Sequence, residues 1–138
     1  MDENKQTSVR RWLGKARNDL QTARAMLDVN PSVTDVICFH AQQCAEKCLK
    51  AYLTHIDRHV ERTHNLKKLL KDCAAHDPEF NQLMELAESL LDYAVITRYP
   101  DSWVEIPLAE AQTAAQNAAR VMYFILAKIG INPEKECR

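Results

Sequence analysis

The sequence predicts an all-α protein, and two observations carry that prediction. The 138-residue chain holds only two glycines, Gly14 and Gly130, and its five prolines are spread out, so there is little material for tight hairpins or phosphate-binding loops. Apolar residues recur at spacings of three and four, without convincing strand alternation. We therefore expect one up-and-down bundle of about five helices at residues 8–130, with flexible ends at residues 1–7 and 131–138.

The first three helices are expected at residues 8–28, 34–56 and 63–76. Asn30 and Pro31 interrupt the first apolar stripe, and both residue types favour turns. Ser32 or Thr34 is the expected N-cap of the second helix, since a side-chain oxygen there can accept a backbone hydrogen bond.

The last two helices follow from the proline positions. Asp77 is a plausible cap and Pro78 a natural first-turn residue for a fourth helix, which we expect to continue until Pro100. The segment from Pro100 to Pro107 must be a connection, because prolines bound both its ends. A final helix is predicted at residues 108–129, closed by Gly130.

Charge and composition narrow the class of protein. The 18 basic and 19 acidic side chains leave a net charge of −1, which argues against a surface built wholly for nucleic acid but leaves room for a local basic patch. No export signal or membrane-length apolar run is visible, so we expect a cytoplasmic protein with no membrane association. The five cysteines should then be reduced thiols.

The segment FHAQQCAEKCLKAYL, residues 39–53, lies in the helix that we expect to be central. On a helical wheel its apolar residues cover an arc of about 200°, wider than a surface helix needs. Such an arc can contact neighbours on two sides, which favours a homodimer. The remaining, polar arc is expected to carry Gln43, Glu46, Lys47 and Lys50.

Gln42 lies inside the apolar arc and His40 at its border. Either both are hydrogen-bonded in or beside the core, as buried polar groups usually are, or both face a polar cleft. His40, Cys44 and Cys48 share one side of the helix, but no fourth zinc ligand is indicated and cysteine is also a small core residue. We expect core cysteines, no metal and no cofactor.

Three motifs in this order resemble the HEPN domain family: FHAQQCAEKCLKAYL, then THNLKKLL, then a helix ending in ITRYPD. The resemblance extends from Val9 to about Ile129. It implies a helical bundle that usually dimerises, in a bacterial or archaeal cytoplasmic protein commonly encoded beside a minimal nucleotidyltransferase. Family members bind nucleotides or act as metal-independent ribonucleases in toxin–antitoxin and other defence systems.

Ribonuclease members of the family carry Arg, four to six residues, then His, and Arg58 and His64 have that spacing. A histidine can transfer the 2′-hydroxyl or leaving-group proton, and a forked guanidinium can hold the scissile phosphate. The pair can equally be an incidental match in a loop rich in His and Arg, since short motifs have many false positives.

The basic residues around this pair predict a phosphate-binding surface, although a solvated helix face is the simpler interpretation. Thr63 and His64 are expected at a helix N-terminus, where free backbone N–H groups favour an anion. The residues that we expect to bind nucleotide or phosphate are Arg62, Lys68, Arg98, Tyr99 and His40.

Three hypotheses follow. The first is a nucleotide-binding homodimer that pairs with a minimal nucleotidyltransferase, as in toxin–antitoxin systems. The second is a metal-independent ribonuclease that uses Arg58 and His64 on RNA. The third is a purely structural helical dimer.

Overall fold

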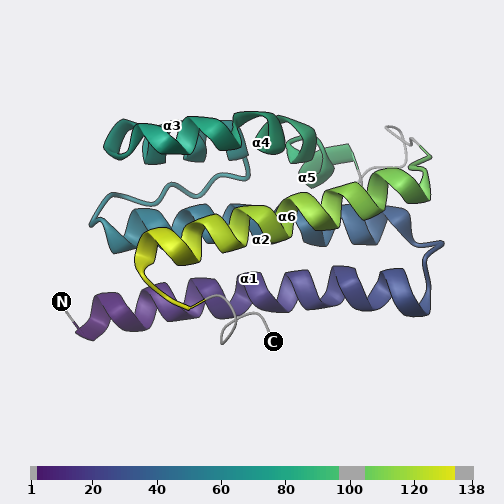
Figure 1. Cartoon of the computed structure of the whole chain (residues 1–138), viewed down its shortest axis with the longest axis horizontal. Helices are drawn as coiled ribbons and strands as arrows, with labels where there is room; N and C mark the ends of the chain where they lie inside the picture. Colours follow the sequence, from purple (N-terminus) through teal and green to yellow (C-terminus); the bar gives the residue numbers. More distant parts are fainter. Residues whose placement is uncertain (1–2, 97–104, 133–138) are drawn as a thin grey trace.

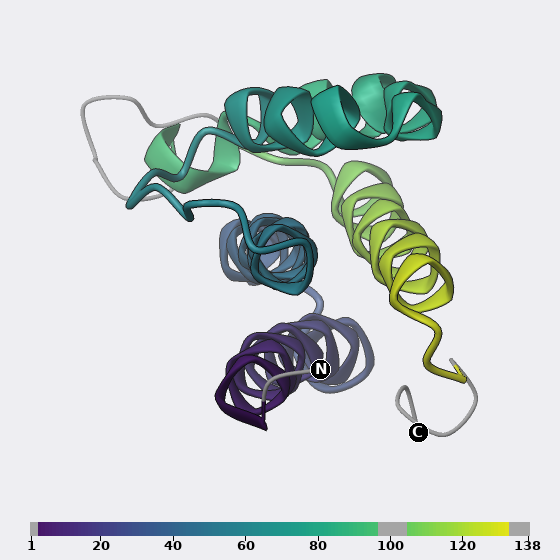
Figure 2. The same cartoon turned by 90° about the vertical axis from the view of Figure 1, so that its left-hand side faces the viewer.

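The protein is a helical bundle centred on one helix. The computed structural model describes residues 3–96 and 105–132 and contains no strand within them. Helix α1 (Glu3–Val29) and helix α2 (Thr34–His55) are antiparallel neighbours joined by a short turn (Figure 1). Figure 2 shows α2 between α1 on one side and the layer that contains α3 on the other.

The remaining elements cover two further sides of α2. Helix α3 (Leu66–His76), the 3₁₀ helix η1 (Pro78–Leu83), helix α4 (Met84–Leu90) and the short α5 (Tyr93–Ile96) form the layer opposite α1, and α6 (Leu108–Ile129) packs alongside (Figures 1 and 2). Helix α2 contacts α1, α3, α4, α5 and α6. The all-α prediction and the central position of the second helix are therefore confirmed.

The wide apolar arc of α2 is covered by helices of the same chain. Cys38, Cys44 and Cys48 on α2 and Cys73 on α3 are buried free thiols in the hydrophobic core. The expectation of core cysteines is confirmed at these four positions, while Cys137 lies outside the described residues. Since neighbours in one chain account for this arc, its width no longer supports a dimer.

Helix α2 begins at Thr34 as predicted but without either expected cap, and helix α3 begins later than predicted. The N-cap of α2 is Val33, which makes no side-chain cap bond, and Ser32 instead bonds the Asn30 side chain. Helix α3 begins at Leu66 rather than Thr63, and Asn65 Oδ1 accepts a hydrogen bond from the Lys68 backbone N–H at 3.1 Å. This side chain occupies one of the free donors that were expected to attract an anion.

The prediction of one continuous fourth helix is wrong, because the described part of this segment is divided into η1, α4 and α5. Asp77 is its cap as expected, accepting from the Glu79 N–H at 3.0 Å. The first turns are 3₁₀, a geometry that places residues i and i+3 on one side; Phe80 and Leu83 are both buried there. Phe80 packs on the Tyr52 and Phe124 rings, with centroid distances of 4.4 and 5.0 Å.

The predicted bounds of α1 and α6 are closer to those in the structure. Helix α1 starts at Glu3, so residues 3–7 are helical rather than a separate N-terminal segment. Helix α6 has the predicted bounds, and Gly130 caps it in the left-handed conformation at φ 92°. No helix in the described ranges is long and apolar enough to span a membrane.

Candidate functional site

A buried polar strip runs along α2. Gln42 is fully buried, and Gln43, Glu46 and Lys50 are 8%, 3% and 6% exposed. The last three were expected on the solvated arc, and that expectation is wrong. Helix α1 and the segment between α2 and α3 cover them: the Lys50 ammonium lies 5.5 Å from the centroid of the Trp12 ring, and Gln42 bonds to the His64 backbone.

Glu46 is the centre of this strip. Its Oε1 lies 2.7 Å from Nδ1 of His64, and its Oε2 accepts a hydrogen bond from the Lys50 ammonium at 3.2 Å. The Gln42 amide nitrogen donates to the His64 carbonyl oxygen at 3.1 Å and lies 3.5 Å from Glu46 Oε1. Gln43 donates to Gln42 Oε1 at 2.6 Å. Every polar side chain of the strip therefore has a partner, as buried polar groups require.

This arrangement orients His64. Because an ionised carboxylate can only accept, Nδ1 must carry the proton that bonds to Glu46. The Nε2 edge is then available to a ligand when the ring is neutral, and the side chain is 55% exposed. A half-exposed imidazole held by a buried carboxylate can accept or donate a proton at its free edge.

The segment between α2 and α3 brings His64 back to the middle of α2. Helix α2 ends in a Schellman motif: Asp57 adopts φ 60°, its N–H bonds to the Thr54 carbonyl, and the Arg58 N–H bonds to the Leu53 carbonyl. From there the chain returns along α2 toward α3 (Figure 1). Since Leu53 is seven residues beyond Glu46, the Arg58 backbone lies about 10 Å along the helix from the Glu46 level.

Arg58 and His64 therefore occupy opposite ends of one exposed segment. Arg58 is exposed at the end of α2, whereas His64 is held at the level of Glu46. An extended Arg58 side chain can approach a phosphate that also contacts His64. The two residues are nevertheless positioned separately, because Glu46 bonds the His64 ring whereas the end of α2 holds the Arg58 backbone. Their assignment as a catalytic pair stays a prediction.

A second carboxylate organises the face of α2 toward α1. Asp19 of α1 is 8% exposed; one oxygen lies 2.8 Å from His40 Nδ1 and the other 2.5 Å from the Lys47 ammonium. His40 is thus bonded beside the core, as the first of its two interpretations anticipated, and its side chain remains 28% exposed. Its assignment to nucleotide binding stays a prediction.

The other predicted phosphate-binding residues differ in whether an acidic side chain already pairs with them. Arg62 and Lys68 are both exposed, but Lys68 forms an ion pair with Glu61 at 3.2 Å, which raises the pKa of its ammonium. Lys67 is similarly paired with Glu88 at 3.4 Å. Arg98 and Tyr99 lie outside the described residues. No cluster of three or more possible metal ligands occurs in the described ranges.

Sequence reasoning missed Glu46 and Asp19 as organising residues. The available signal was the Glu46–Lys50 pair at spacing i, i+4, but this spacing is also common on solvated helix faces. The burial of Glu46 and Lys50 depends on Trp12 and on residues near His64, which are far away in the sequence.

Fold and site together define a compact α-helical domain whose central helix carries a buried, charged polar strip. The HEPN domain model matches residues 9–129, and the chain belongs to this family. Among solved structures, the chain is similar to the protein TT1696 from Thermus thermophilus, with 32% identity and a TM-score of 0.73 over 87% of this chain and 97% of the other.

An archaeal HEPN homologue, ST0689, is also similar: 26% identity and a TM-score of 0.70, covering 88% of this chain and 97% of the other. A comparison with curated proteins found no match.

Proposed function

We propose that this HEPN protein is a nucleotide-binding module that forms a homodimer and pairs with a minimal nucleotidyltransferase, in the manner of a toxin–antitoxin system. The observation that carries the nucleotide-binding part is the Glu46-held His64, exposed beside a segment with several cations. Family membership supports the homodimer and the transferase partner as parts of this proposal.

The energetics of the strip favour a site over a purely structural role. Burying a carboxylate and an ammonium costs several kcal/mol of desolvation per ion, and apolar side chains of similar volume often give equal or greater stability. Buried charges that are retained despite this cost, and that hold an exposed imidazole in place, are candidates for a functional role. Glu46, Lys50 and His64 fit that description.

A nucleotide would contact the exposed edge of this strip. The His64 Nε2 edge offers a hydrogen bond, and the guanidinium groups of Arg58 and Arg62 can hold phosphate oxygens in a forked geometry. Lys68 is already paired with Glu61, so its charge is partly compensated. We therefore expect Arg62 to contribute more to phosphate binding than Lys68.

Calorimetric titration with AMP and ATP tests this proposal. Arg62→Glu should weaken nucleotide binding strongly and Lys68→Glu less, and binding by the unmodified chain should weaken as salt rises because the charges are screened. Lys15→Glu on α1 is the matched control for a general charge effect. Unchanged affinity in Arg62→Glu would place the nucleotide elsewhere.

The ribonuclease alternative has an observation of its own. A histidine whose Nδ1 is bonded to a buried carboxylate is oriented for general acid or base catalysis at Nε2, and Arg58 can stabilise the charge on the scissile phosphate. This chemistry needs no metal at either residue.

Assays on a broad set of RNAs in the presence of EDTA test the alternative. If the chain cleaves RNA, His64→Ala should lose about 10²–10⁴-fold in rate, and Arg58→Lys should also fail because an ammonium cannot reproduce the forked contact. His59→Ala, in the same exposed segment, is the control. No cleavage by the unmodified chain would exclude this alternative and leave the binding and structural hypotheses.

The partner can be tested independently. A small nucleotidyltransferase gene beside this one, whose product co-purifies with the chain, would support the pairing. Absence of both nucleotide binding and a co-purifying transferase would favour the third hypothesis, a structural helical dimer.

A further inference from the structure

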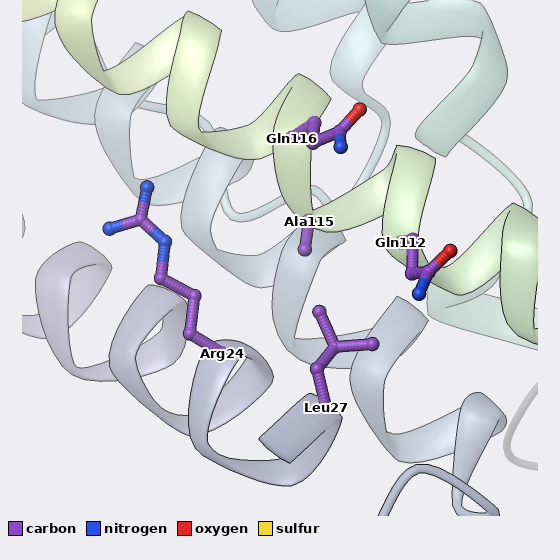
Figure 3. Close-up of a pocket in the computed structure, with 5 residues that line it drawn as sticks. All are labelled: Arg24, Leu27, Gln112, Ala115 and Gln116. Carbon is purple, nitrogen blue, oxygen red and sulfur yellow. The ribbon is translucent and has the colours of Figure 1, made fainter.

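A second polar site lies between α1 and α6, away from His64. Arg24, Leu27, Gln112, Ala115 and Gln116 surround an open cavity of about 330 Å³. Figure 3 shows the Arg24 side chain extending from α1 into the space between the two helices, with Leu27 and Ala115 pointing toward each other across it. Figure 2 places α6 and the α2–α3 connection on different sides of α2.

The polar groups around this cavity are uncommitted. In the described part of the chain, Arg24, Gln112 and Gln116 make no hydrogen bond or ion pair with another side chain. An arginine presents five N–H donors and no acceptor, and each glutamine amide adds donors and an acceptor. Leu27 and Ala115 supply the apolar contacts. A fitting ligand therefore has an anionic head, further polar groups and a short carbon skeleton.

The cavity volume indicates how much of the ligand can be enclosed. At about 30 Å³ per water molecule in the liquid, 330 Å³ corresponds to about eleven waters. Such a space holds a compact metabolite of about a dozen non-hydrogen atoms, whereas a complete nucleotide is about twice that size. The site is thus distinct in place from the one proposed near His64, and it can enclose only part of a nucleotide.

We propose that this cavity binds a small carboxylate or phosphate anion, with Arg24 holding the charged head and the amides of Gln112 and Gln116 bonding to its polar groups. Arginine suits both kinds of anion because its fork matches the oxygen spacing of each. The two amides stand one turn apart on α6, four residues along the helix, and so can contact two groups of the same ligand.

Titration of the ¹⁵N-labelled chain followed by NMR tests the proposal, with citrate as the carboxylate probe and 3-phosphoglycerate as the phosphate probe. We expect at least one of them to shift the side-chain amide signals of Gln112 and Gln116 in a saturable way. Arg24→Gln should weaken that binding about ten- to hundredfold, as expected for loss of a charged hydrogen-bond donor.

Two variants control for indirect effects. Arg10→Gln removes another exposed arginine on the same flank of α1, about 21 Å along the helix from Arg24, and should leave the affinity unchanged. Gln116→Leu, of similar size, should weaken binding without altering the fold, since the position is exposed. Failure of both anions to bind, or equal affinity in Arg24→Gln and the unmodified chain, would overturn the proposal, whatever the outcome of the nucleotide titration.

Discussion

At Glu46, one buried carboxylate has two basic partners, so the fold should be sensitive to its removal. The side chains of Glu46 and Lys50 are only 4% and 8% exposed. Removing one member of a buried pair leaves the other charge without compensation, at a cost of about 3–5 kcal/mol. Replacing both by apolar residues removes the desolvation cost as well.

We therefore predict that Glu46→Leu lowers the free energy of unfolding by about 3–5 kcal/mol, and that adding Lys50→Met restores most of it. Urea unfolding measures both values. The exposed pair Lys68–Glu61 is the control, where Glu61→Leu should cost less than about 1 kcal/mol. A double variant as unstable as Glu46→Leu alone would show that the carboxylate stabilises the fold through His64 or Gln42 rather than Lys50.

His55 is a second residue with a distinct electrostatic role. Its Nδ1 is buried and has no hydrogen-bond partner among the described residues. Burial lowers the pKa of His55 from its ordinary 6.5, helped by the Lys5 charge and opposed by Asp57. The unfolded chain then binds the proton more readily than the folded chain, so stability falls as pH drops through 6.5 toward the folded-state pKa.

We predict that His55→Phe becomes more stable relative to the unmodified chain as the pH is lowered from about 7.5 to about 5.5, because it removes a group that the folded state resists protonating. Chemical unfolding at the two pH values measures this change, and subtracting the two proteins cancels the other titrating groups. A constant difference across that range would contradict the assignment.

At the scale of elements, the two glycines have opposite roles. Gly14 lies in the middle of α1, while Gly130 ends α6 at φ 92°, and an added Cβ would meet no atom within 4 Å at either position. The two positions therefore differ in backbone conformation and not in the space available for a Cβ. Alanine is favoured in a helix interior but strained in the left-handed conformation.

Gly14→Ala should raise the free energy of unfolding by about 0.5–1 kcal/mol, and Gly130→Ala should lower it by about 1–2 kcal/mol. Thermal or urea unfolding distinguishes the two signs. Gly130→Asn should lose less than Gly130→Ala, because asparagine tolerates the left-handed region better. The same sign in both alanine variants would mean that one of these helix assignments is wrong.

The elements that local sequence predicted well are those whose ends have strong local signals. Pro107 and Gly130 bound α6, and its limits were predicted correctly. The segment after Pro78 was harder, because the apolar spacing that suggested one helix also fits a 3₁₀ turn followed by two shorter helices. The polar strip of α2 was not predictable at this level, since Trp12 and His64, which cover it, come from distant segments.

At the scale of the whole molecule, the proposed homodimer is supported by family membership and by exposed apolar residues. Val29, Val36 and Leu108 are 78%, 37% and 42% exposed. They belong to the end of α1, the first turn of α2 and the start of α6, which gather at one end of the bundle (Figure 1). Exposed apolar residues that cluster are typical of protein contacts, whereas isolated ones are ordinary.

We predict that light scattering gives the mass of two 15.8 kDa chains over a wide concentration range. Leu108→Glu should shift the equilibrium toward single chains, because a charge in an apolar contact loses its hydration without gaining a partner. Tyr123→Glu is the matched control, since Tyr123 is equally exposed at 42% but lies about four turns further along α6. Dissociation by Tyr123→Glu alone would move the contact to the C-terminal part of α6. A single-chain mass for the unmodified protein at all concentrations would exclude the dimer.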